Sequence, residues 1–66
     1  MKFKVGDVVK VKEGDRAGET GIVVDLNKWY RWVKVRFDNG DTDWLLFSEV
    51  EIVKQRSSLL KERIGD

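Results

Sequence analysis

The stretch Trp29–Phe37 reads WYRWVKVRF and is the longest run of strand-favouring residues in the chain. It holds two of the three tryptophans and the only tyrosine. Successive side chains of a strand point to opposite faces, so the odd and even positions should separate. The odd-numbered face begins with Arg31 and continues with Val33, Val35 and Phe37. Its apolar part is expected to form one wall of the core.

The even-numbered face of this stretch is aromatic and basic, and it consists of Tyr30, Trp32, Lys34 and Arg36. Aromatic rings stack on nucleobases at about 1–3 kcal/mol each, and lysine and arginine side chains hold phosphates. The pattern therefore predicts a face that binds nucleic acid. The alternative is structural: Tyr30 and Trp32 pack beneath a helix near the C-terminus, and the two cations only keep the surface soluble.

The pair Asn39–Gly40 follows this stretch and precedes a second strand-like run. Asn-Gly is the strongest short signal for a hairpin, because a type I′ turn needs positive φ at both central positions. We therefore expect residues 31–37 to pair with residues 42–47 as an antiparallel hairpin. The second run does not alternate cleanly, and a bend or single helical turn at Phe47–Glu49 would move some of its apolar side chains inward.

Three more short strands are predicted from alternating patterns. The first covers residues 8–13, with Val9 and Val11 facing the core. Lys10 and Lys12 then face outward, either as an ordinary solvated face or, with Arg16, as an extension of a basic surface. In the second strand, residues 22–26, the inward residues are expected to be Ile22, Val24 and Leu26, and the outward ones Val23 and Asp25. In the last strand, residues 50–53, the inward residues are expected to be Val50 and Ile52.

Five short strands joined by glycine-rich turns predict an all-β domain, in the form of a small, partly open barrel. Closure into a barrel reduces the number of unpaired strand edges. The barrel should span residues 1–53, and residues 54–66 should form a short helical tail. The tail carries three apolar residues that could dock on the barrel or on a partner: Leu59, Leu60 and Ile64.

The composition argues against several kinds of site. The 66-residue chain has no histidine, cysteine or proline, and 41% of its residues are hydrophobic and 38% charged. These values describe one soluble globular domain without disulfides. Histidine is the commonest general base and metal ligand, so no serine or threonine has its usual activating partner. The cluster of Asp38, Asp41 and Asp43 lacks the glycine and distal glutamate of a calcium loop. We expect a protein that is not an enzyme and uses no cofactor or metal.

Two segments of the chain resemble the KOW motif. They are residues 5–11, VGDVVKV, and residues 17–24, AGETGIVV, which give a Gly-Asp strand, a loop ending in glycine and a second strand. Residues 33–40 and 50–53 are similar to the later strands of KOW and related SH3-like barrels. The resemblance implies a five-stranded, partly open SH3-like barrel. Such barrels include ribosomal proteins and elongation factors that touch RNA or DNA, subunits of larger enzymes, and peptide-binding modules.

The loop between the two KOW-like strands departs from the family pattern. It carries Glu13, Asp15 and Glu19 against a single cation, Arg16. The loops of KOW domains that contact RNA are usually basic. This loop is therefore expected to be a poor phosphate binder.

A second candidate site combines aromatic rings with carboxylates, and it consists of Trp29, Trp44, Asp41 and Asp43, with Tyr30 nearby. Rings beside carboxylates can hold a methylated lysine or arginine, as Tudor-like barrels do, at about 0.5–2 kcal/mol per contact. They can also receive a proline-rich or basic peptide, as SH3 domains do. The structural alternative is that Trp44 belongs to the core and the two aspartates are turn residues.

Charge is distributed unevenly along the chain although the net charge is only +1. Residues 1–37 carry nine basic and five acidic residues, whereas residues 38–53 carry five acidic and no basic ones. This predicts one basic and one acidic face. The longest apolar run is residues 44–47, far short of the roughly 20 residues of a membrane span. We expect a cytoplasmic binding module without membrane contact, whose partner is nucleic acid. The alternative is a protein partner, bound by SH3-like or Tudor-like peptide recognition or as a small subunit of a larger complex.

Overall fold

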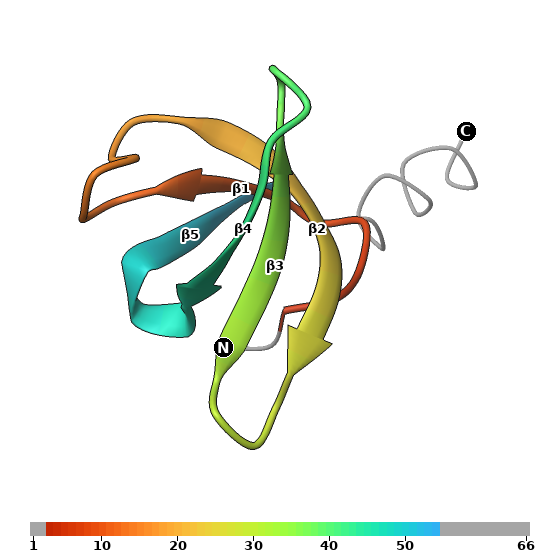
Figure 1. Cartoon of the computed structure of the whole chain (residues 1–66). Coiled ribbons are helices and arrows are strands. Elements are labelled where there is room, and N and C mark those ends of the chain that lie inside the picture. Colours follow the sequence, from red (N-terminus) through yellow and green to blue (C-terminus); the bar gives the residue numbers. More distant parts are fainter. Residues whose placement is uncertain (1–2, 55–66) are drawn as a thin grey trace, which may run out of the picture.

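A computed structural model describes residues 3–54 as one antiparallel sheet that curls into a small barrel (Figure 1). The sheet order is β4-β3-β2-β1-β5, and a single 3-10 turn, η1, joins β4 to β5. The bounds are Val8–Val11 for β1, Thr20–Asn27 for β2, Trp32–Phe37 for β3, Thr42–Leu46 for β4, Phe47–Glu49 for η1 and Val50–Lys54 for β5. The predicted all-β, SH3-like barrel is confirmed. The predicted helical tail, with Leu59, Leu60 and Ile64, lies outside the described residues.

The core is built mainly from valines, whose branched side chains suit a pleated surface. Its buried members are Phe3, Val9, Val11, Val23, Val33, Val35, Phe37 and Val50. Four more apolar side chains pack partly buried against them: Leu26, Leu45, Phe47 and Ile52. The inward faces predicted for β1, β3 and β5 are therefore confirmed. The expected single helical turn after β4 is also present, as η1.

The prediction for β2 was wrong at its first three positions. Val23 is fully buried, whereas Ile22 is 49% and Val24 37% exposed. The cause is Gly21, which lies on the inner face opposite Phe37 and sets the phase of the strand. A Cβ there would meet the Arg36 carbonyl oxygen at 2.5 Å, so only glycine lets β2 and β3 approach this closely. A register shift between Val23 and Asp25 then turns Leu26 inward.

The β3–β4 hairpin forms as predicted, with Trp32 opposite Leu46 and Arg36 opposite Thr42. Its turn differs from the expected two-residue type. Gly40 has a positive φ of 92° and donates its N–H to the Phe37 carbonyl, while Asn39 does not adopt positive φ. The loop therefore has three residues, 38–40, closed by a glycine in the left-handed region.

Candidate functional site

The outward side chains of β2, β3 and β4 form one apolar and basic surface, which we call the outer face. Its apolar and basic members are Ile22, Val24, Trp32, Lys34, Arg36, Trp44 and Leu46. The register adds three polar residues to the same face: Asp25 opposite Lys34, Asn27 opposite Trp32 and Thr42 opposite Arg36. In the register, Trp32 lies opposite Leu46 and Lys34 opposite Trp44. Directly opposed residues of an antiparallel pair share a face and lie close together. Trp32 and Trp44 are therefore diagonal neighbours on the two strands of the hairpin, and Leu46 and Lys34 are the other diagonal pair.

The apolar members of the outer face are substantially exposed. Trp32, Trp44 and Leu46 expose 43%, 40% and 43% of their surface. Single exposed apolar residues are ordinary, but a contiguous group of them on a monomer marks an interaction site. The alternative in which Trp44 belongs to the core is therefore wrong.

Tyr30 extends the outer face beyond the start of β3. Its ring centroid lies 6.1 Å from that of Trp32, with the ring planes tilted by 44°. Its backbone N–H donates to Asn27 Oδ1 at 3.1 Å, which fixes the turn that carries it. The structure thus places the predicted nucleic-acid residues Tyr30 and Trp32 side by side, with Lys34 and Arg36 further along the same face of β3.

The two other cations predicted for this surface separate. Lys10 projects from β1 beside Thr20 and Glu51, with β2 between it and β3. Lys12, just after β1, lines a different feature, an open groove of about 820 Å³. The described residues along this groove are Phe3, Lys12, Lys28, Tyr30, Arg31, Leu46, Phe47, Ser48 and Val50. We call it the basic groove. It shares Leu46 with the outer face and Tyr30 with the extension of that face.

Arg31 occupies an unusual position in the basic groove. Among the described residues it is the one non-glycine residue with positive φ, at 59°. Its carbonyl oxygen accepts a hydrogen bond from the Phe47 N–H at 2.8 Å. A side chain with a Cβ pays a steric cost in this region, so such residues persist only where their surroundings enforce them.

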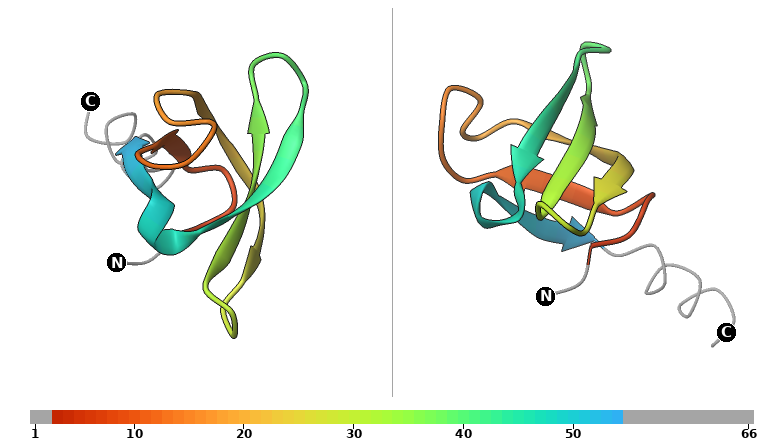
Figure 2. Two further views of the ribbon diagram at one scale, coloured as in Figure 1. Left: turned by 60° about the vertical axis from the view of Figure 1, so that its left-hand side comes forward. Right: turned by 60° about the horizontal axis from the view of Figure 1, so that its bottom comes forward.

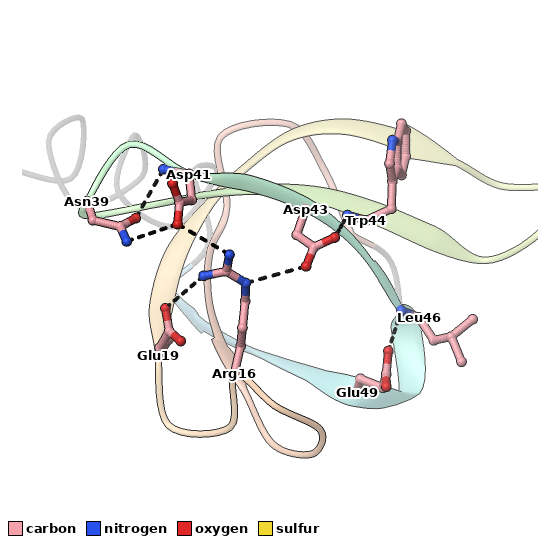
Figure 3. Close-up of polar contacts among 8 residues, drawn as sticks. All are labelled: Arg16, Glu19, Asn39, Asp41, Asp43, Trp44, Leu46 and Glu49. Carbon is pink, nitrogen blue, oxygen red and sulfur yellow. Dashed lines mark hydrogen bonds and ion pairs between the residues drawn. The ribbon is translucent and has the colours of Figure 1, made fainter.

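Three acidic side chains, those of Glu19, Asp41 and Asp43, gather around Arg16 at the opposite end of the hairpin, and we call these four residues the Arg16 cluster (Figure 3). The Arg16 guanidinium lies 3.2 Å from Glu19 and 3.4 Å from both Asp41 and Asp43. It also lies over the Phe37 ring, 4.4 Å from the centroid. Desolvation lowers the pKa of Arg16, but the hydrogen bonds that Arg16 donates to Asp41 and Asp43, together with the negative charge of Glu19, outweigh this and raise that pKa above its ordinary value. Arg16 thus ties the β1–β2 loop to the hairpin and does not extend the basic surface.

The four residues of the second candidate site do not come together. Trp29, 94% exposed, lies in the β2–β3 turn, whereas Asp41 and Asp43 lie at the far end of the hairpin. Figure 2 shows the β2–β3 turn and the β3–β4 loop at opposite ends of β3. Trp44 points away from Asp43 and Arg16, on the other face of β4 (Figure 3). Both carboxylates already contact Arg16.

The described part of the chain offers neither a metal site nor a membrane span. No three acidic, histidine or cysteine side chains within residues 3–54 are grouped so that they could hold a metal ion. No helix found in that range is long and apolar enough to cross a bilayer.

Sequence reasoning missed several residues of these surfaces. Ile22 and Val24 were assigned to the core, and Lys28 and Arg31 were given no role. The signal for the first pair was Gly21, because a glycine facing a buried phenylalanine fixes which face of β2 turns inward. Nothing local signals the second pair, because the basic groove forms only when η1 and the β2–β3 turn are brought together.

The fold is that of a small SH3-like β-barrel, and comparison with a solved structure agrees. This chain is similar to a chain in the crystal structure of the MjSpt4:Spt5 complex in conformation B, with a TM-score of 0.78 and 26% sequence identity. The similarity covers 83% of this chain but only 40% of that chain. No protein-family model matches the sequence. No curated protein matches it either.

Proposed function

We propose that this protein is a non-catalytic binding module that contacts RNA or DNA through Tyr30, Trp32, Lys34 and Arg36. The observation that carries the proposal is the exposed pair of rings, 6.1 Å apart, in line with two cations on the same face of β3. Rings exposed in this way stack on unpaired bases, and the cations neutralise the phosphates between them.

The form of the surface favours single strands over duplexes. Bases within a duplex are stacked on one another, so a protein ring reaches them only where the strand is open. Tyr30 is 69% exposed and Trp32 43%, so both side chains are accessible to an unpaired base. Lys34 and Arg36 lie two and four residues beyond Trp32, which spaces the contacts along a strand at about 6.6 Å for each pair of residues.

Titration of the full chain with labelled 12-mers of dT and rU tests the proposal. We expect tryptophan fluorescence to change on binding, and affinity to fall steeply between 50 and 200 mM salt, as for any ligand that releases counterions. A duplex of equal length should bind more weakly. Absence of binding to every oligonucleotide at low salt would rule the proposal out.

A second candidate function is protein binding within a larger complex, and the apolar part of the outer face favours it. Leu46 lies opposite Trp32, and Ile22 and Val24 are exposed on β2, yet none of these three side chains has a role in base stacking. The similar solved structure is itself a complex of two proteins. Affinity capture with the full chain, before and after nuclease treatment, separates the two functions. Partners that survive nuclease but are lost with Trp44→Ala support protein binding.

A further inference from the structure

The basic groove adjoins the proposed base-stacking rings. Tyr30 and Leu46 line the groove, and the centroid of the Tyr30 ring lies 6.1 Å from that of the Trp32 ring. A strand whose bases lie on Tyr30 and Trp32 would reach the groove at its next phosphates. The groove is open along its length, so a flexible chain can enter without threading.

The charges of the basic groove are arranged for an anion. Lys12 comes from the end of β1, while Lys28 and Arg31 come from the β2–β3 turn. No carboxylate lies among the described residues that line the groove. Every ion pair within residues 3–54 belongs to Arg16, so these three cations have no acidic partner in that range. Like charges held near one another without a counterion create a positive potential that attracts anions.

The wall of the groove is held in place before any ligand arrives. The Tyr30 N–H is bound by Asn27 Oδ1, and the Arg31 carbonyl by the Phe47 N–H. These two hydrogen bonds join the β2–β3 turn to β2 on one side and to η1 on the other. Binding to a fixed surface costs less ordering of the protein than binding to a mobile one.

We infer that the basic groove holds the phosphate backbone of the same single strand whose bases stack on Tyr30 and Trp32. Lys12, Lys28 and Arg31 bind the phosphates, the guanidinium of Arg31 being suited to two parallel hydrogen bonds. The Ser48 hydroxyl is a further donor on the groove wall. This inference rests on the proposed function and adds three phosphate-binding residues to it, all of which lie outside β3 and the outer face.

The test compares the salt dependence of binding in three versions of the full chain, using a labelled dT 12-mer. In Lys12→Gln/Lys28→Gln two groove cations are neutral, and the backbone of Arg31 is untouched. Lys54→Gln removes one exposed cation at the far end of β5 as a matched control. For single strands each phosphate contact contributes about 0.7 to the slope of log K against log salt. The double variant should therefore lower the slope by about 1.4 and the affinity at 50 mM salt by about tenfold, while Lys54→Gln leaves both unchanged.

The outcomes separate this inference from the proposed function. If the wild-type chain binds no oligonucleotide, both fail together. If it binds but the double variant keeps the wild-type slope and affinity, the inference alone is overturned. A last measurement uses polyglutamate of the same charge as an unlabelled competitor. If it displaces the labelled dT 12-mer as well as unlabelled dT does, the groove binds anions in general and the inference is overturned. Circular dichroism checks that each variant is folded. If the double variant does not fold, Arg31→Gln repeats the test at the third groove cation.

Discussion

The cations at the two ends of the β3–β4 hairpin differ in whether they contact carboxylates. At the loop end, Arg16 is surrounded by Glu19, Asp41 and Asp43, and its guanidinium also covers the Phe37 ring. At the other end, Lys12, Lys28 and Arg31 line the basic groove without an acidic partner among the residues described. Figure 1 shows the β3–β4 loop and the β2–β3 turn at opposite ends of β3.

The difference separates charges that serve the fold from charges available to a ligand. The β1–β2 loop, whose acidic composition predicts a poor phosphate binder, is joined to the β3–β4 hairpin through its single cation, Arg16, which contacts Asp41 and Asp43. Isolated exposed ion pairs contribute little, with a median near 0–1 kcal/mol, but three carboxylates on one guanidinium form a network. Lys12, Lys28 and Arg31 have no acidic partner within residues 3–54, so within that range they remain available to an anion.

The largest expected effect comes from Gly21, because it sets the strand spacing on which both ends depend. Gly21→Ala places a methyl group 2.5 Å from the Arg36 carbonyl oxygen and 2.6 Å from Val35 Cγ1. Overpacking of this kind costs about 1–3 kcal/mol, and contact with backbone puts the variant near the upper limit. Urea unfolding measures the loss. Thr20→Ala, at the exposed neighbouring position, is the control and should stay within about 0.5 kcal/mol of wild type.

The next effect concerns the outer face and leaves the fold intact. Trp32→Ala should weaken single-strand binding by about 1–3 kcal/mol, which is roughly 5- to 150-fold, because one stacking platform is removed. Trp29→Ala is a matched control, since Trp29 is 94% exposed and lies outside the outer face. Fluorescence anisotropy compares the two. Equal losses from both variants would contradict the assignment of Trp32 to the interface.

A third prediction sets stability against binding at the basic groove. Arg31→Gly relieves the left-handed backbone at φ 59° and should raise the free energy of unfolding by up to about 1 kcal/mol. The same change removes a groove cation and should weaken oligonucleotide binding severalfold. Arg36→Gly, in the extended part of β3, is the control and should lower stability instead. If Arg31→Gly is less stable than wild type, the positive φ is not a source of strain.

These surfaces also show how far local sequence patterns carry a prediction. The faces of β1 and β3 follow from simple alternation, and the hairpin follows from Asn39–Gly40. The face of β2 does not, because Ile22, Val24 and Leu26 alternate as well as a core strand should. The close approach at Gly21 and the register shift after Val23 override that alternation, and both depend on β3. A pattern within one strand cannot reveal them.

The candidate site residues also differ in whether they lie on one strand or come together only in the folded chain. Alternation predicts that Tyr30, Trp32, Lys34 and Arg36 share one face, and in the structure they do, while their role in binding nucleic acid stays a prediction. From the sequence, Asp41 and Asp43 can be either ligands for a partner's cation or turn residues, because no local pattern reveals that Arg16, more than 20 residues away, reaches them. The groove cations come from two segments that meet only in the folded barrel.

The smallest expected effect is at the Arg16 cluster, and its sign is more informative than its size. Arg16→Met keeps an apolar side chain near the Phe37 ring but leaves Glu19, Asp41 and Asp43 facing one another. Added salt screens attraction in the wild-type chain and repulsion in the variant. The melting temperature of the variant should therefore rise between 20 and 500 mM NaCl, while that of the wild type falls or stays level.

Hydrogen exchange localises this change. The Gly40 and Phe37 amides close the β3–β4 loop, so they should exchange faster in Arg16→Met at low salt and recover at high salt. The Tyr30 amide, at the other end, should not respond. Nor should oligonucleotide binding, because the basic groove is formed without Arg16. A variant that loosened both ends together would show that the two are coupled through the sheet, and that the Arg16 cluster supports the binding surface as well as the loop.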